Sequence, residues 1–184
     1  MKKLGILLLV LAILGGGYYY VTQDKLADWK TYQNTQFGFD FKHPADFLTC
    51  DVSNFRGGSL SLGLYKAPNC DITRTDPPEI GIFIVDAVTN KSVQDLFLEE
   101  FPRARDAENY SSIKTFKLGG LDAYGGEMKF KQEFSEYGII VFIGNDRLMI
   151  IKSPFYIYPL PGQKVSNVTT KPAIDGIIST LEFN

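Results

Sequence analysis

Hydrophobic and polar residues alternate along several short segments of this chain. One segment spans residues 37–42 and ends at His43-Pro44, and another spans residues 60–64. A period of two predicts strands with one buried face. Residues 80–85 are apolar at nearly every position, which instead predicts a strand covered on both faces. The buried positions of the two alternating segments are Phe37, Phe39, Phe41, Leu60, Leu62 and Leu64.

Helical spacing replaces this alternation from residue 92 onward. Ser92 is suited to be an N-cap, with Asp95 three residues later, and Pro102 ends the predicted helix. A second helix closes the chain, with Pro172 in its first turn. Its apolar stripe should pack on a sheet and consists of Ile174, Ile177, Ile178 and Leu181.

Four strands are predicted between the two helices, around residues 113–118, 123–130, 137–143 and 147–152. Glycine-containing turns at 119–120 and 144–146 indicate consecutive hairpins. The glycine pairs at 57–58, 119–120 and 125–126 lack the sequence context of a phosphate-binding loop, so turns are the favoured interpretation of all three.

The order strands, helix, four-strand meander, helix predicts an α+β fold with a mainly antiparallel sheet and helices on its faces. A single domain at residues 29–184 follows a short polar tether at residues 22–28. A chain of this length buries enough surface for a stable core.

The first 21 residues have a different pattern. Lys2 and Lys3 precede an uncharged apolar run at residues 4–21, which as a helix would be about 27 Å long and just able to cross a bilayer. Lysines on the cytoplasmic side and tyrosines at the far interface are typical of a signal anchor. The prediction is a single-pass cell-membrane protein whose C-terminal domain is extracytoplasmic.

A cleaved signal peptide is the main alternative, because residues 4–14 form a short apolar region and residues 15–17 are glycines. The protein would then be secreted. A buried soluble helix is a third interpretation, although no polar residue marks a second face. Both leading interpretations place the remaining chain outside the cytoplasm.

The net charge of the predicted exported part differs from that of the whole chain. The whole chain has a net charge of −2, and a pI near 5.4 argues against binding nucleic acid through bulk charge. Without Lys2 and Lys3, 17 basic residues face 21 acidic ones, so the exported part has a charge of −4. An anionic lipid surface repels such a domain.

Cys50 and Cys70 are the two cysteines of the chain. An even number of cysteines in an oxidising compartment predicts a disulfide. Two buried free thiols are the alternative. A zinc site would need four ligands, and His43 is the one histidine present, so neither a metal nor another cofactor is expected.

Several short motifs resemble the PsbP-like family. Residues 31–34 and 37–47 resemble its opening, in which an aromatic-Asn pair precedes a Gly-Phe-x-Phe-x-x-Pro-x-x-aromatic hairpin. Residues 119–123 resemble its Gly-Gly-x-x-Ala turn, and residues 174–183 resemble its closing helix and Thr-x-x-Phe end. The resemblance covers residues 29–184.

The resemblance implies an α/β/α sandwich around an antiparallel sheet, as in the extrinsic photosystem II subunit and a nuclear Ran-binding factor. It also implies a non-catalytic binding or assembly protein, of a bacterial exported type. The chain differs from the plant members by its own membrane segment and its cysteine pair.

Candidate catalytic groups are few. His43 precedes a proline at a strand end, where a turn residue is more usual than a general base. Glu99-Glu100 and the pair Asp106 and Glu108 should form a solvated face. The acidic residues between 71 and 79 are too widely spaced for a calcium loop. We therefore expect no enzyme.

The segment 153–162 is apolar, aromatic and rich in proline, although it connects the last strand to the last helix. Exposed aromatic side chains in such a loop would form a contact patch, and the candidate partner-binding residues are Phe155, Tyr156, Tyr158, Pro159 and Pro161. Alternatively, its apolar side chains pack beneath the sheet.

The predicted function is a membrane-tethered binding or assembly module that uses this loop or a sheet face for a protein partner of the cell envelope. An exported small-ligand receptor or an enzyme with an unrecognised pocket is the alternative, and a structural envelope protein is a third possibility.

Overall fold

The structure is a computed structural model that describes residues 26–52, 59–66, 70, 78–86, 91–130, 134–144, 147–153 and 167–184. The predicted membrane segment 4–21 lies outside these residues. Neither helix of the described part is long and apolar enough to cross a bilayer.

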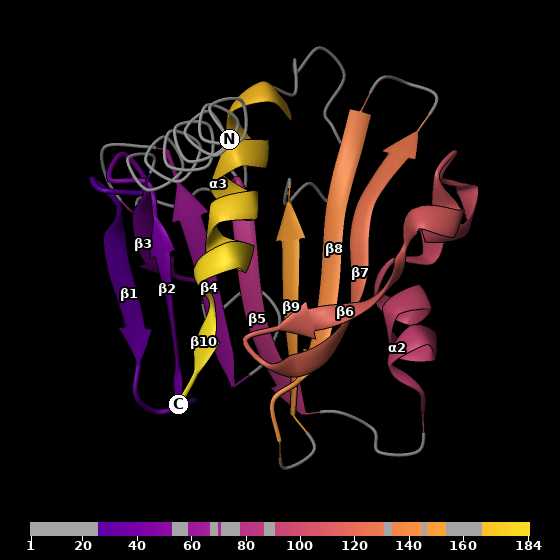
Figure 1. Cartoon of the computed structure of the whole chain (residues 1–184), viewed down its shortest axis with the longest axis horizontal. Coiled ribbons are helices and arrows are strands. Elements are labelled where there is room, and N and C mark those ends of the chain that lie inside the picture. The colour runs from indigo at the N-terminus through magenta and orange to yellow at the C-terminus, as the bar shows by residue number, and fades with distance from the viewer. Residues whose placement is uncertain are drawn as a thin grey trace, which may run out of the picture.

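The described residues form ten strands and two α-helices, which are labelled in Figure 1. The first strands are β1 (Lys30–Asn34), β2 (Phe39–His43), β3 (Leu48–Asp51), β4 (Leu60–Tyr65) and β5 (Ile80–Asp86). Helix α2 (Val93–Glu100) and two 3-10 turns, η1 (Pro102–Asp106) and η2 (Tyr110–Ser112), come next. The remaining elements are β6 (Lys114–Leu118), β7 (Leu121–Phe130), β8 (Phe134–Phe142), β9 (Arg147–Ser153), α3 (Asn167–Thr180) and β10 (Glu182–Phe183).

Seven strands form one antiparallel sheet in the order β3-β4-β5-β9-β8-β7-β6. Strands β6 to β9 are neighbours in chain order, which confirms the predicted meander. A smaller antiparallel sheet has the order β1-β2-β10. The α+β class with a mainly antiparallel sheet is thus confirmed.

The large sheet has a separate core on each face. Ile82 and Ile151 face the core that contains Ile174 of α3, and Phe83 and Ile150 face the core that contains Phe97 of α2. Strand β5 therefore contributes alternate residues to both cores, as its continuous apolar sequence predicted. Helices α2 and α3 cover opposite faces of the sheet.

The start and the end of helix α2 agree with those predicted from Ser92 and Pro102. The Oγ atom of Ser92 accepts a hydrogen bond from the Asp95 N–H at 3.1 Å, so Ser92 is the N-cap. Phe101 caps the other end, and Pro102 begins η1. Helix α3 differs from the prediction: it begins at Asn167, so Pro172 lies inside the helix rather than in its first turn. At this position Pro172 removes one intrahelical hydrogen bond, and its ring crowds the carbonyl of the preceding turn.

Two of the predicted glycine turns have different outcomes. Gly119 and Gly120, with φ of 54° and 86°, form the two-residue turn between β6 and β7, as predicted. Gly125 and Gly126 lie inside β7, so the prediction of a turn was wrong there. The glycine pair at 57–58 lies outside the described residues.

Candidate functional site

A bend in β7 shapes the face of the sheet that α3 covers. Gly125 and Gly126 have φ of 152° and 153°, a region that residues with a Cβ atom rarely adopt. A Cβ atom on Gly125 would lie 2.1 Å from the carbonyl oxygen of Gly138 on β8, so this position requires glycine. In Figure 1, the first half of β7 and β6 curve out of the sheet and pass in front of β8 and β9.

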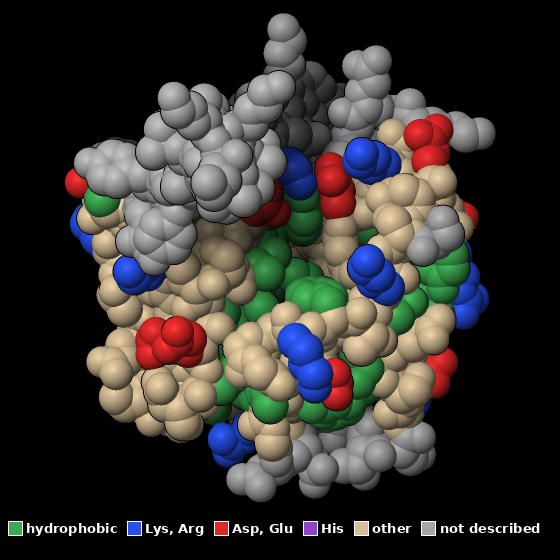
Figure 2. Space-filling model, in the orientation of Figure 1, with side chains coloured by type: hydrophobic (Ala, Val, Ile, Leu, Met, Phe, Trp, Pro, Cys, Tyr) green, Lys and Arg blue, Asp and Glu red, His purple; other side chains and the backbone are tan. Residues whose placement is uncertain are grey.

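The space between α3 and the curved strands is lined by hydrophobic side chains. Figure 2 shows them gathered in a depression on this face of the molecule. On the elements around this space, the side chains that are only partly buried against the α3-side core are Phe116 of β6, Leu121 of β7, Tyr137 of β8, Ile178 of α3 and Phe183 of β10. We call this depression the α3–β6 hollow. It offers apolar surface that the described part of the chain does not fully cover.

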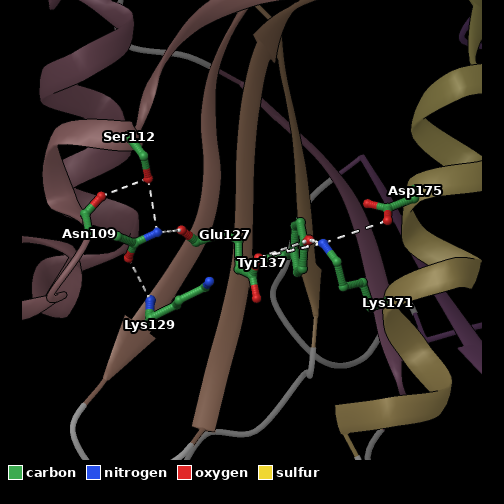
Figure 3. A network of polar contacts seen from close by, with 7 residues as sticks. All are labelled: Asn109, Ser112, Glu127, Lys129, Tyr137, Lys171 and Asp175. Atoms are coloured by element: carbon green, nitrogen blue, oxygen red, sulfur yellow. Dashed lines mark hydrogen bonds and ion pairs between the residues drawn. The ribbon is translucent and has the colours of Figure 1, made fainter.

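A polar cluster lies between α3 and the strands β7 and β8 (Figure 3). The Lys171 ammonium contacts the Tyr137 hydroxyl and is 3.5 Å from Glu127 Oε2 and 3.6 Å from Asp175 Oδ2. The Tyr137 hydroxyl donates to Glu127 Oε2 at 3.4 Å. These contacts connect α3 to β7 and β8.

The charges of this cluster argue against proton-transfer chemistry. The hydrogen bond with Tyr137 raises the pKa of Lys171, and burial raises the pKa of Tyr137. Near neutral pH, Lys171 therefore stays charged and Tyr137 stays protonated, so neither group is activated as a base or nucleophile. The cluster is better suited to fixing α3 against the sheet.

The side chain of Asn109 is hydrogen-bonded to the backbone of the second half of β7, a part of that strand that does not pair with β6 (Figure 3). Its Nδ2 donates to the Glu127 carbonyl at 2.7 Å, and its Oδ1 accepts from the Lys129 N–H at 2.8 Å. A side-chain amide thus takes the place of a neighbouring strand. The same Nδ2 also donates to Ser112 Oγ at 2.9 Å.

The opposite face of the sheet holds a second charged cluster. Lys152 on β9 lies 3.8 Å from Glu100 at the end of α2, and the two side chains are only 16% and 15% exposed. The Lys152 ammonium also lies 5.1 Å from the centre of the Phe101 ring. Burial raises the pKa of the nearby Glu136 carboxyl, an effect that Lys152 and Arg103 oppose. This cluster connects the C-terminal end of α2 to strand β9 of the sheet.

The described residues do not place His43 in a catalytic arrangement. His43 is buried, its Nδ1 lies 3.0 Å from the Pro44 carbonyl oxygen, and its ring contacts Phe41. Burial lowers the pKa of His43, which favours the neutral imidazole. Within the described ranges no carboxylate or hydroxyl is hydrogen-bonded to it.

The predicted disulfide between Cys50 and Cys70 is present, with the two Cα atoms 5.7 Å apart. It connects β3 to the segment between β4 and β5. In the part of the chain that the structure describes, no group of three or more His, Cys, Asp or Glu side chains could hold a metal ion. Asp71 and Asp76 of the acidic loop lie outside the described residues.

A pocket of about 460 Å³ lies beside α2 and η1. Its lining mixes two cations, two anions and two apolar residues: Lys91, Asp95, Leu98, Glu99, Pro102 and Arg105. Lys91 and Glu99 already form an ion pair across it. The mixed, internally paired charges define no ligand class.

The candidate partner-binding residues Phe155, Tyr156, Tyr158, Pro159 and Pro161 all lie outside the described residues. The sequence did not predict the α3–β6 hollow. Ile178 was predicted to pack on the sheet, and it does pack against the α3-side core, although it stays partly exposed. A glycine pair inside a strand pattern was the available signal, because it can mark a bend as well as a turn.

The described part of the chain has a large antiparallel sheet with a helix on each face. The solution structure of cyanobacterial PsbP (CyanoP) from Synechocystis sp. PCC 6803 is similar over 86% of this chain and 94% of that chain, with a TM-score of 0.51 and 14% sequence identity. No family model matches the chain, and no curated protein matches it significantly. The chain thus has a PsbP-like fold, as the sequence motifs suggested.

Proposed function

We propose that this protein is a non-catalytic binding or assembly module that is tethered to the membrane by residues 4–21 and holds a protein partner outside the cytoplasm. The α3–β6 hollow carries the proposal. Apolar side chains that stay accessible on one face of a folded domain are typical of protein-binding surfaces. The sheet face thereby becomes the preferred contact surface, and the loop around residues 155–161 is a second candidate.

The titratable groups support binding over catalysis. His43 is buried and neutral, Lys171 is held by two carboxylates and a phenol, and Lys152 is paired with Glu100. Each group is therefore either buried or already paired within the fold. The PsbP-like fold supports the same proposal by analogy.

The disulfide supports a location outside the cytoplasm, because disulfides persist in oxidising compartments. Lys2 and Lys3 support an orientation with the N-terminus in the cytoplasm. A reporter fused after Asn184 should therefore be active outside the cytoplasm. Activity only in the cytoplasm would contradict this topology.

Co-purification from membranes tests the binding function. The full chain is isolated in mild detergent with its bound proteins, together with the variants Ile178→Lys and Leu98→Lys. Both residues are partly buried aliphatic side chains on helices, but Ile178 borders the α3–β6 hollow and Leu98 lies on α2. We expect Ile178→Lys to lose the partner and Leu98→Lys to retain it.

Melting temperatures of both variants provide the control for folding. Equal retention of the partner by two folded variants would exclude the hollow, and the variant Tyr156→Ala with Tyr158→Ala would then test the loop. Recovery of no stoichiometric protein with the unmodified chain would contradict the binding function itself.

A further inference from the structure

Strand β6 is an edge of the large sheet, and among the described residues no strand pairs with the side of its backbone that faces away from β7. Leu118 and Leu121 flank the two-residue turn, so they form a hydrogen-bonded pair. Such pairs alternate along an antiparallel ladder, so Phe116 and Ala123 form the next hydrogen-bonded pair. The N–H and C=O groups of the alternate residues Thr115 and Lys117 consequently point away from β7. Across the described ranges, no residue is hydrogen-bonded to these four groups.

This open side of β6 borders the α3–β6 hollow. β6 passes in front of β8 and β9 in Figure 1, and the hydrophobic side chains in Figure 2 lie between it and α3. Phe116 of β6 packs toward the α3-side core. Residues opposite each other in paired strands point to the same face, so a strand added to β6 would direct alternate side chains toward the hollow.

The neighbouring edge of β7 is not available for such pairing. Asn109 already bonds the Glu127 carbonyl and the Lys129 N–H, and the Glu108 N–H donates to the Lys129 carbonyl at 2.8 Å. Strand addition on this side of the sheet is therefore confined to β6, where main-chain groups can supply affinity and the apolar hollow can supply specificity.

The side chains of β6 favour a particular occupant. Lys114 and Lys117 are exposed, and β6 itself has no acidic residue. Lys117 contacts Asp122 at 2.9 Å, but both side chains are about two-thirds exposed, so this ion pair is weak. Two copies of β6 would bring lysines together, which disfavours pairing between copies. Acidic side chains on the outer face of an added strand would instead complement Lys117, which lies on the face of β6 opposite to Phe116.

We infer that the open edge of β6 and the α3–β6 hollow bind an extended segment of the protein partner, in which apolar residues alternate with acidic ones. This inference rests on the proposed binding function and names the site and the chemistry of the partner segment. The backbone of Thr115 and Lys117 pairs with the segment, and its apolar side chains cover the hollow.

A labelled nine-residue peptide of alternating valine and glutamate tests the inference by fluorescence anisotropy with the full chain in detergent. Lys117→Pro removes one open N–H, whereas Lys117→Ala keeps the backbone and removes the charge. We expect the proline variant to weaken binding by about tenfold or more and the alanine variant by about threefold, because backbone pairing contributes more than one exposed charge. A peptide of alternating valine and lysine should bind more weakly than the glutamate peptide.

Amide hydrogen exchange provides a measurement that does not depend on the proline variant folding. The bound glutamate peptide should slow exchange of the Thr115 and Lys117 amides by about tenfold or more, because N–H groups that were exposed to water become hydrogen-bonded to the peptide. Unchanged exchange at saturation, or no measurable peptide binding, would overturn the inference.

The co-purified partner separates this inference from the proposed function. If a folded Lys117→Pro chain retains that partner as well as the unmodified chain does, the β6 site is wrong and the binding function stands. If the unmodified chain recovers no partner, the proposed function fails.

Discussion

The two faces of the large sheet are covered to different extents. On one face, Phe97 of α2 packs against Phe101 and Tyr124, with ring centres 4.7 and 5.2 Å apart, and the Lys152–Glu100 pair closes the edge. On the other face, α3 packs on β2, and the Thr180 hydroxyl accepts a hydrogen bond from the Lys42 N–H at 3.0 Å. The space between α3 and β6 is left as the hollow.

This difference suggests that one face of the sheet mainly stabilises the fold and that the other face mainly provides a binding surface. A closed face removes apolar surface from water and therefore stabilises the fold. A face that leaves apolar surface accessible gives up part of that stabilisation and keeps surface for a partner. Substitutions on the α2 face should accordingly change the free energy of unfolding, whereas substitutions at the hollow should mainly change binding.

The largest effect should come from removing a fully buried ring of the α2 face. Phe97 is 0% exposed, so Phe97→Ala should lower the free energy of unfolding by about 3–5 kcal/mol. Phe116→Ala at the hollow should lower it by less than about 2 kcal/mol, since that ring is already partly in water. Urea unfolding of both variants measures the difference. Equal losses would show that the two faces are equally closed.

A somewhat smaller effect is expected from the bend that creates the hollow. Gly125→Ala would place a Cβ atom against the Gly138 carbonyl and should cost about 2–4 kcal/mol from strain and overlap together. It should also weaken peptide binding, because β6 would move with β7. The matched control is Gly120→Ala, which also has positive φ but no atom within 4 Å of the added Cβ, and should cost about 1 kcal/mol.

Similar losses from the two alanine variants would show that the overlap at Gly125 relaxes easily. The bend would then not depend on glycine at this position.

Local patterns in the sequence were sufficient for much of the fold. Alternation predicted β2 and β4, a continuous apolar run predicted β5, and the Ser92–Asp95 pair predicted the start of α2. Each of these signals depends on residues that are close in the chain. The meander was also predicted, because short turns force neighbouring strands to pair.

Other features depend on contacts between distant residues. β1 is largely exposed and lacks an apolar period, and β10 exists because Glu182 and Phe183 pair with Asp40 and Phe39 of β2. Gly125-Gly126 was interpreted as a turn, since nothing nearby in the sequence reveals the Gly138 carbonyl. The α3–β6 hollow could not be predicted for the same reason: it depends on where α3 and β6 fail to meet.

The smallest effect is expected from a change of pH. Each side of the sheet buries a different titratable group, so the two sides should contribute differently to the pH dependence of the free energy of unfolding. Burial beside Phe41, on the α3 side, lowers the pKa of His43 from its ordinary value of 6.5. The folded chain then binds fewer protons at this site than the unfolded chain, so stability should fall as the pH drops below about 6.5. On the α2 face, burial raises the pKa of Glu136 above 4.5, so that carboxyl should add stability as the pH falls toward 4.5.

Urea midpoints between pH 7.5 and 4.5 can separate these opposite contributions in the variants His43→Gln and Glu136→Gln. His43→Gln should reduce the loss of stability that begins below about pH 6.5, because an amide does not titrate there. Glu136→Gln should remove the gain at lower pH and leave the region near pH 6.5 unchanged. A pH dependence of His43→Gln that matches the unmodified chain would mean that the imidazole is solvated, and that the α3 side is open at β2 as well as at the hollow.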